Sequence, residues 1–222
     1  MKSGMGCALI ALVVVGCRTP PRPAEPPGIP KASTVEELAA AIAADAKRSD
    51  REPDAKIRVE LAAEANNDAA ACLAREPQAA ACLYGRAIAL GLEARAHPTR
   101  AGELLNAMLG SLADAEAVDP SYDEAGPARV RALVLIRAPG WPLGPGDAET
   151  GLVAARRAAT LRPQYPPNFL ALAEALAKTG DSNGARENYE HARALAQALP
   201  AGTDRDGWLR EADEALLRQS DR

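Results

Sequence analysis

Three prolines recur at a fixed spacing, and this spacing constrains the fold of the 222-residue chain more than any other feature. Pro120 follows Pro77 by 43 positions, and Pro163 follows Pro120 by the same number. The same period superposes three small residues, three alanines and three leucines: Cys72, Ala115 and Ala158; Ala89, Ala132 and Ala175; Leu90, Leu133 and Leu176. A fixed period of this size is typical of stacked supersecondary units, each of which buries its apolar face against the next. The chain is therefore predicted to be a solenoid of repeated units.

The last full unit shows which kind of unit is repeated. It reads NFLALAEALAKTGDSNGARENYEHA, with two sets of residues at helical spacing: Phe169, Leu172, Ala173 and Leu176, then Ala185, Tyr189 and Ala192. Each set lines one helix face, and Gly180 with Asp181 marks the break between the two helices. The arrangement resembles the tetratricopeptide pattern, in which small residues let the paired backbones approach closely. We therefore predict an all-α fold, a right-handed solenoid of tetratricopeptide-like helical hairpins.

The repeat also predicts where the helices lie. We expect paired helices at 34–48 and 54–75, 78–95 and 99–118, 123–137 and 147–161, and 167–179 and 182–199. A final amphipathic helix should begin after Thr203 or Asp204 and carry on one face Trp208, Ala212, Ala215 and Leu216. Because a terminal repeat exposes an apolar face unless something covers it, this C-terminal helix is predicted to cap the solenoid. The repeat domain is expected to span residues 34–219.

The first residues do not continue the repeat. Lys2 precedes the apolar run MGCALIALVVVG, which is too short to span a bilayer and has the length of the apolar region of a signal peptide. The run ends in VVGC, which is similar to a bacterial lipobox. Residues 1–17 are therefore predicted to be a lipoprotein signal peptide, with Cys17 as the lipidated residue. A plain secretory signal with a nearby cleavage site is the alternative, and either one implies export.

A proline-rich segment separates this signal from the helices. Residues 18–33 begin with RTPPRPAEPPGIPK and show no apolar periodicity. Such a segment favours extended polyproline II, at roughly 3 Å per residue, so it is predicted to be a tether between the lipid and the domain. Arg18 stands directly after Cys17, and the absence of aspartate there weakly favours the outer membrane. The expected location is the bacterial cell envelope, on the periplasmic side.

Composition and motif content argue against catalysis and against nucleic-acid binding. The formal net charge of −4 gives no electrostatic basis for binding nucleic acid or an anionic membrane surface, so the lipid is the only membrane contact expected. His97 and His191 do not stand at metal-ligand spacing from cysteines or carboxylates. No nucleophile elbow, phosphate loop or dinucleotide fingerprint is present in the sequence. The protein is predicted to be non-enzymatic, with no cofactor and no metal.

Two of the four cysteines lie symmetrically about a repeat proline. Cys72 falls near the end of one expected helix and Cys82 near the start of the next, with Pro77 between them. An antiparallel turn brings such positions together, and an exported protein meets an oxidising compartment. A disulfide between Cys72 and Cys82 is predicted, and two small buried thiols are the alternative.

The third and fourth units carry a more specific resemblance. The chain from Asp119 reads DPSYDEAGPARVRALVLIRAPGWPLGPGDAETGLVAARRAATLRPQYPPNFLALAEAL. It resembles the T-component family of TRAP-type transporter systems, which are periplasmic tetratricopeptide-like lipoproteins. The matching elements are Gly126-Pro127-x-Arg129, the loop from Ala138 to Pro142, and Gly146-Asp147.

The resemblance implies a helical scaffold that works beside a periplasmic solute-binding protein and has a cavity or channel for a small organic solute. A second interpretation is a cell-envelope scaffold whose concave surface binds a partner protein, with no solute pocket. Either interpretation is compatible with a homo-oligomer.

The loop APGWPLGPGD, residues 138–147, is the most unusual segment of the repeat domain. Its prolines fix φ and its glycines permit tight reversals, so it is expected to be stiff. One hypothesis is that Trp141, Pro142 and Arg129 rim a pocket on the concave side and bind a ligand or partner. The alternative is that Trp141 fills the end of the core between neighbouring helices.

Overall fold

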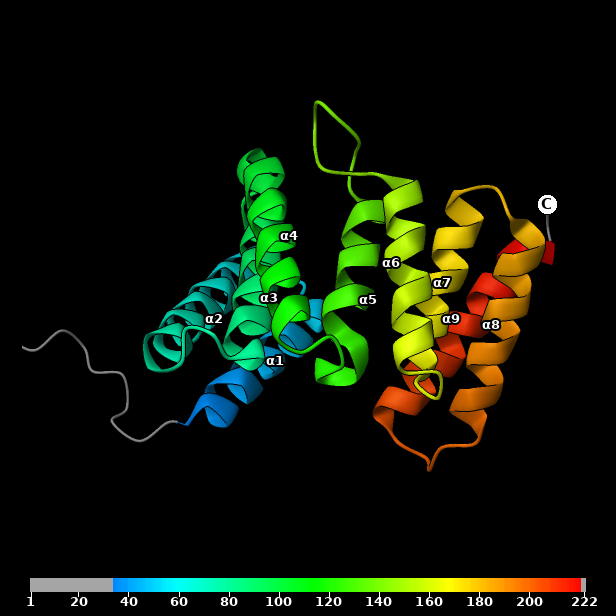
Figure 1. Cartoon of the computed structure of the whole chain (residues 1–222), viewed down its shortest axis with the longest axis horizontal. Coiled ribbons are helices and arrows are strands. Elements are labelled where there is room, and N and C mark those ends of the chain that lie inside the picture. Colours follow the sequence, from blue (N-terminus) through cyan, green and yellow to red (C-terminus); the bar gives the residue numbers. More distant parts are fainter. Residues whose placement is uncertain (1–33, 221–222) are drawn as a thin grey trace, which may run out of the picture. The chain divides into compact units, whose positions relative to one another are not determined.

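The structure, a computed structural model, describes residues 34–220, and every regular element among them is a helix (Figure 1). The elements are α1 (Val35–Arg51), α2 (Ala55–Arg75), α3 (Ala80–Ala96), the short 3-10 helix η1 (Pro98–Arg100), α4 (Ala101–Val118), α5 (Tyr122–Arg137), α6 (Ala148–Leu161), α7 (Pro166–Lys178), α8 (Ser182–Gln197) and α9 (Thr203–Ser220). The predicted helices are all present, with ends that differ by a few residues. The signal peptide, Cys17 and the tether lie outside the described residues.

Capping residues explain where several helices begin. The Thr34 hydroxyl accepts a hydrogen bond from the Glu37 N–H at 3.2 Å, and the Glu37 carboxylate accepts one from the Thr34 N–H at 2.8 Å. This capping box satisfies two backbone donors that a helix start leaves unpaired. Asp147 and Asp181 accept from backbone N–H groups in the same way at the starts of α6 and α8.

None of the helices in residues 34–220 combines the length and the apolar character that a membrane span requires.

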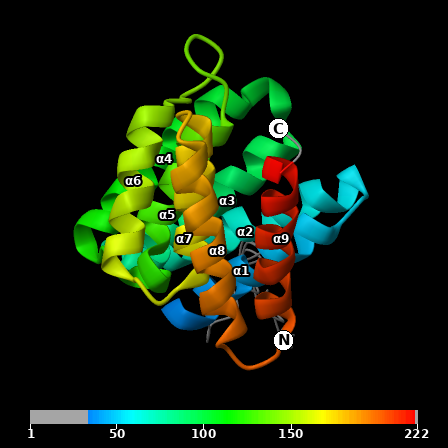
Figure 2. The ribbon, with the colours of Figure 1, turned by 90° about the vertical axis from the view of Figure 1, so that its right-hand side faces the viewer.

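Consecutive helices form hairpins, and the hairpins stack (Figure 2). Each odd-numbered helix also packs on the next odd-numbered helix, whereas the backbones of successive even-numbered helices lie farther apart, and α4 and α6 are linked through the ion pair between Glu116 and Arg157. The odd-numbered helices therefore form the inner layer of the curved stack, and the even-numbered helices form its outer layer. This arrangement is the predicted solenoid of helical hairpins.

The repeated small residues are the points of closest packing. The triplet Cys72, Ala115 and Ala158 is completely buried, and so is the triplet Ala89, Ala132 and Ala175. In the last hairpin the inward positions Ala173 and Ala185 are also completely buried, with Tyr189 and Ala192 beside them in the same core. Side chains this small let two helix backbones approach closely. Each unit needs them at the same place, so they recur every 43 residues.

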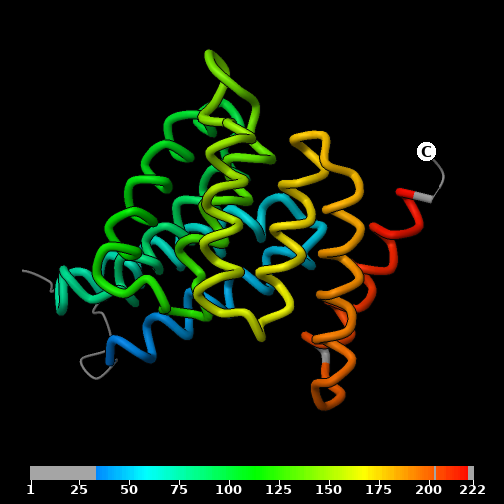
Figure 3. The backbone as a smooth tube through the Cα atoms, turned by 45° about the vertical axis from the view of Figure 1, so that its right-hand side comes forward, coloured from blue at the N-terminus to red at the C-terminus, as the bar shows by residue number. Residues whose placement is uncertain are grey.

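The last helix, α9, covers the C-terminal end of the solenoid. Ala212 and Ala215 of α9 are buried against α7 and α8, and Trp208 and Leu216 pack on the same cluster. This confirms α9 as the C-terminal capping helix. The stack of helices is curved (Figure 3). α1 approaches the start of α9, where the Lys47 ammonium lies 3.2 Å from a carboxylate oxygen of Asp204.

Candidate functional site

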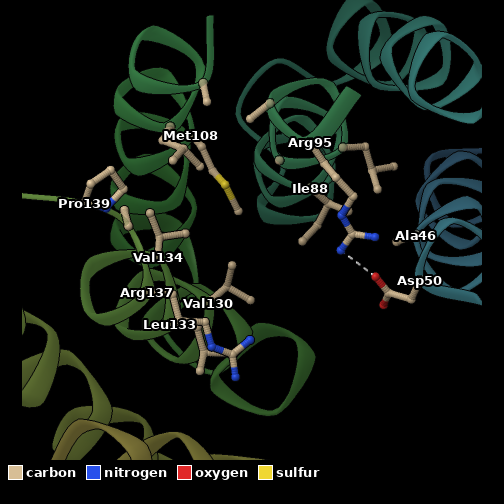
Figure 4. A pocket seen from close by; sticks show the side chains of 16 residues that line it. Ala46, Asp50, Ile88, Arg95, Met108, Val130, Leu133, Val134, Arg137 and Pro139 are labelled. Atoms are coloured by element: carbon tan, nitrogen blue, oxygen red, sulfur yellow. Dashed lines mark hydrogen bonds and ion pairs between the residues drawn. The ribbon is translucent and has the colours of Figure 1, made fainter. Parts of the chain in front are cut away.

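An apolar groove lies between the α3–α4 hairpin and α5. Its volume is about 760 Å³, and α1 contributes Ala46 and Asp50 to its far side. α3 packs less closely on α5 than α5 does on α7, and this leaves the groove open. The apolar lining includes Ile88, Leu92, Leu105, Met108, Val130 and Val134. Figure 4 shows the side chains of Ile88, Met108, Val130 and Val134 facing the space between the helices. The dimensions are those of a site for a small ligand or for a few side chains of a partner.

Two arginines reach the groove, and each is paired with a carboxylate. The Arg95 guanidinium donates to Asp50 at 2.7 Å (Figure 4), and the Arg137 guanidinium donates to both carboxylate oxygens of Glu174, at 2.8 and 2.5 Å. The hydrogen bond with Glu174 raises the pKa of Arg137. The groove is therefore an apolar surface with two locally neutralised ion pairs at its polar edge.

The loop between α5 and α6 stands at one end of this groove. Ala138 and Pro139, its first two residues, are part of the groove lining. The loop is closed by backbone hydrogen bonds: Gly146 N–H donates to the Pro139 carbonyl at 2.9 Å, and Asp147 N–H donates to the Leu135 carbonyl at 2.9 Å. A Cβ on Gly146 would lie 2.8 Å from the Pro139 carbonyl oxygen, so only glycine fits this closure.

The tip of the loop presents apolar side chains to solvent. Trp141 is 91% exposed and Leu143 is 77% exposed, with Pro142 between them. The hypothesis that Trp141 fills the end of the core is therefore wrong. Trp141 and Pro142 do not line the groove, although the Leu143 carbonyl lies against Gly102 at the start of α4. The loop and the groove are neighbours, and the side chains of the loop tip do not enter the groove.

Arg129 is not part of this surface. Only 8% of the residue is exposed, and its side chain points toward the start of α5, away from the loop. Long side chains in a helix lean toward its N-terminus, and Arg129 stands eight residues before the end of α5. The hypothesis that Arg129 rims a pocket together with Trp141 and Pro142 is therefore not supported, because the two groups lie toward opposite ends of one helix.

Arg129 instead holds an unusual turn in place. Asp123, Glu124 and Ala125 have φ values of 47, 55 and 63°, which is the left-handed region, and none of them is glycine. Three such residues in a row cost roughly 1–2 kcal/mol each. One nitrogen of the Arg129 guanidinium donates to the Asp123 carbonyl at 3.2 Å and to the Glu124 carbonyl at 3.0 Å. The other donates to the Asp123 carboxylate at 3.0 Å.

Asn168 of α7 completes this cluster. Its side chain is fully buried, accepts from Arg129 at 3.2 Å, and donates to the carbonyls of Glu124, Ala158 and Arg162. The Arg129 guanidinium also lies over the Tyr165 ring, 5.1 Å from its centre. Three successive helices, α5, α6 and α7, are thus joined through one buried amide.

Tyr84 explains the glycine of the Gly126-Pro127-x-Arg129 motif. The Tyr84 hydroxyl donates to the Asp123 carboxylate at 2.9 Å. Burial, together with the nearby Asp123 charge, raises the pKa of this hydroxyl, so it remains a proton donor. A Cβ on Gly126 would lie 2.8 Å from the Tyr84 oxygen. The motif therefore builds the start of α5 and does not face the groove.

The structure places Cys72 and Cys82 in a disulfide that links the end of α2 to the start of α3. Their Cα atoms are 5.2 Å apart, and both residues are fully buried. His97 follows α3 and His191 lies on α8, where its ring contacts Phe169. Among residues 34–220, no group of three or more histidines, cysteines or carboxylates is arranged to hold a metal ion.

The sequence did not reveal the groove, although its repeat contained one signal. Leu176 is buried in the core between α7 and its neighbours, but Leu133, its equivalent one period earlier, lines the groove. The same apolar position is thus fully inside the core in one unit, whereas in the preceding unit Leu133 packs on that core and also borders the groove.

Comparison with known proteins agrees with this architecture. No protein-family model matches the chain, and no curated protein matches it in sequence. A solved structure of a thermophilic TPR protein from Thermus thermophilus superposes with a TM-score of 0.55. It is 22% identical in sequence, and the match covers 82% of this chain and 92% of that one. The chain therefore has the fold of a tetratricopeptide-like helical-repeat protein.

Proposed function

We propose that this protein is a non-catalytic binding protein that receives its partner in the apolar groove between the α3–α4 hairpin and α5. The observation that carries the proposal is the groove itself, which is open, apolar and lined mostly by the inner-layer helices α1, α3 and α5, the layer that usually forms the binding face of helical repeats. A partner that offers apolar side chains, or a solute with an apolar part, would replace water there. The paired Arg95 and Arg137 at the edge would orient its polar end.

The biological setting that we propose is an exported, lipid-anchored accessory component of a periplasmic solute-transport system of the TRAP type. Its partner would be a periplasmic solute-binding protein, and the groove would also take a small organic solute. The resemblance of residues 119–192 to T-component sequences supports this proposal, as does the signal-like segment that ends at Cys17. A general protein-binding scaffold of the cell envelope is the second candidate, because the solenoid supports it without any solute.

The binding site is tested by co-purification from the cell envelope with the mature, tethered protein. An Ala101→Arg variant places a long cation at the solvent edge of the groove, and Arg156→Ala on the exposed side of α6 serves as its control. A solute-binding protein should be captured by the wild type and by Arg156→Ala, but lost with Ala101→Arg. Capture of a different envelope protein through the groove would support the second candidate. Equal capture by both variants would contradict the groove as the site.

The membrane anchor is tested separately. Cys17→Ser should remove the diacylglycerol mass from the protein and release it from the membrane fraction. A protein of unchanged mass that remains on the membrane would contradict lipidation at Cys17.

A further inference from the structure

The α5–α6 loop and the groove have complementary properties. From Ala138 to Gly146 the loop reads APGWPLGPG and carries no charged side chain. Its tip exposes Trp141 and Leu143, which are the most exposed large apolar side chains of the described residues. The groove beside it is apolar and open to solvent. An exposed tryptophan on a loop held by backbone hydrogen bonds loses little conformational entropy on binding, so the loop is preorganised to insert.

We propose that Trp141 and Leu143 of one molecule occupy the groove of a second copy of this chain, and that the second copy returns the same contact. The loop rises from the C-terminal end of α5 (Figure 1), and the groove reaches the same end of that helix, because Ala138 and Pro139 belong to both. A two-fold axis between two molecules that meet at this end therefore places each loop against the other groove. Such a self-complementary contact closes at two copies.

The size of the two surfaces suits a dimer. A tryptophan side chain buries up to about 250 Å² on insertion, and Trp141 is almost fully available to do so. Two Trp141 side chains and the matching groove surfaces bury up to about 1,000 Å² in all, and the two Leu143 side chains with their matching surfaces bring the total to the order of 1,200 Å², the lower bound of stable interfaces. A groove of about 760 Å³ accommodates an indole and an isobutyl group together.

Electrostatics favour the same occupant. The loop tip is neutral, and the charges at the groove edge are already paired as Arg95 with Asp50 and Arg137 with Glu174. Two copies can therefore approach without repulsion between like charges. A guanidinium beside an inserted indole also gains a cation–π contact. An anionic membrane is a poorer occupant, because the charged residues flanking the loop include Asp147 and Glu149.

This inference uses the groove of the proposed function but needs neither a solute nor a partner protein. Self-association is measured on the purified protein alone. A dimer would be found even if no solute-binding protein were ever captured, and a monomeric protein could still capture one. The failure of either proposal is therefore distinguishable from the failure of the other.

Sedimentation equilibrium of residues 32–222, the compact unit that contains every described helix, tests the proposal. We expect a concentration-dependent dimer. Trp141→Ala should raise its dissociation constant at least about thirtyfold, as for a central aromatic anchor, and Leu143→Ala should raise it by a smaller factor. Leu217→Ala is the matched control, because Leu217 is 67% exposed on α9, which packs on α7 and α8. Equal effects of Leu143→Ala and Leu217→Ala, or a monomer at all concentrations, would overturn the proposal.

Two further measurements identify what the loop contacts. Ala101→Arg at the groove edge should weaken the dimer as much as Trp141→Ala does, whereas contact between two Trp141 rings would leave it unaffected and overturn the groove assignment. In a Trp208→Phe background Trp141 is the only tryptophan, and its emission should shift to shorter wavelength as dimer forms. A shift seen only on addition of phosphatidylglycerol vesicles would make a membrane the occupant and overturn the second copy.

Discussion

Both ends of α5 carry motifs that contain glycine and proline, but the motif at the first end is buried and the motif at the second end is exposed to solvent. At the first end, Gly126, Pro127 and Arg129 are buried and hold a left-handed turn. At the second end, Trp141 and Leu143 stand in solvent on a closed loop. The regular helix that follows the turn runs from Gly126 to Arg137, and at about 1.5 Å per residue its length is roughly 18 Å. Residues that belong to neighbouring motifs of one family resemblance therefore need not share a site.

The same comparison separates residues that stabilise the protein itself from residues that are available to bind another molecule. The turn at Asp123–Ala125 is strained, but its carbonyls and the Asp123 carboxylate are held by partners inside the protein. The loop is unstrained by comparison, but its largest side chains stand almost entirely in solvent. Exposed apolar groups without an internal role are the ones available to a second molecule. Four variants test this division, in order of decreasing expected effect on stability.

The largest effect is expected at the buried end of α5. Arg129→Ala should lower the free energy of unfolding by about 3–5 kcal/mol, because it removes a buried guanidinium and leaves the Asp123 and Glu124 carbonyls and the buried Asn168 side chain without this donor. Arg129→Lys should recover only part of this loss, since an ammonium cannot reproduce the forked geometry. Chemical denaturation measures both, with Arg156→Ala as the exposed control. A loss below about 1 kcal/mol for Arg129→Ala would show that the turn is stable without its clamp.

Asn168→Ala should lower the free energy of unfolding by about 2–4 kcal/mol, because three backbone carbonyls and the Arg129 guanidinium lose a buried partner. In the double variant with Arg129→Ala the two losses should not add, since both residues belong to one network. Asn188→Ala is the control, because the Asn188 amide donates only to the Gly184 carbonyl of its own helix. Additive losses from Asn168 and Arg129 would contradict a shared network.

The disulfide between α2 and α3 provides a further buried contact, and the stability lost on its removal can be compared with the losses at the two ends of α5. Replacing Cys72 and Cys82 by serine should lower the free energy of unfolding by about 2–3 kcal/mol, the value expected for closing a short loop. Thiol labelling of the unfolded, unreduced wild type should leave both residues unmodified. Full labelling without reductant would mean that the two cysteines are only packed thiols.

The smallest effect on stability is expected at the exposed end. Trp141→Ala should change the free energy of unfolding by less than about 0.5 kcal/mol, because the ring contacts little of its own molecule. Trp208→Ala provides the contrast within the same chain, since Trp208 packs on the core and on Tyr165 and its loss should cost about 3 kcal/mol. A destabilisation by Trp141→Ala as large as that by Trp208→Ala would remove the distinction between the two ends of α5.

The sequence predicted the fold well because the fold follows from local rules. The small residues Ala89, Ala132 and Ala175 recur with the period of the hairpin, and all three are completely buried. The capping position of α9 followed from the apolar face that contains Ala212 and Ala215. Lipidation of Cys17 stays a prediction, because that residue lies outside the described range.

The site was predicted only in part. The α5–α6 loop was expected to be stiff because of its prolines and glycines, and the structure closes it with backbone hydrogen bonds. The exposure of Trp141 did not follow from the sequence, because a buried and an exposed ring fit the same residues. Arg129 was assigned to the wrong surface. Its true environment depends on Asn168 and Tyr84, which approach from 39 residues later and 45 residues earlier in the chain.

The sequence by itself determined the helices, their pairing and the repeat, because these depend on spacing along the chain and on contacts between neighbouring segments. The tertiary structure decided the groove, the left-handed turn and the exposure of Trp141. The groove exists because α3 and α5 pack less closely than α5 and α7, although similar residues occupy the equivalent positions. The turn exists because groups from three helices supply the hydrogen bonds that offset its strain. Distances between helices and bonds across them are set by the whole packing arrangement, and no single segment of sequence contains them.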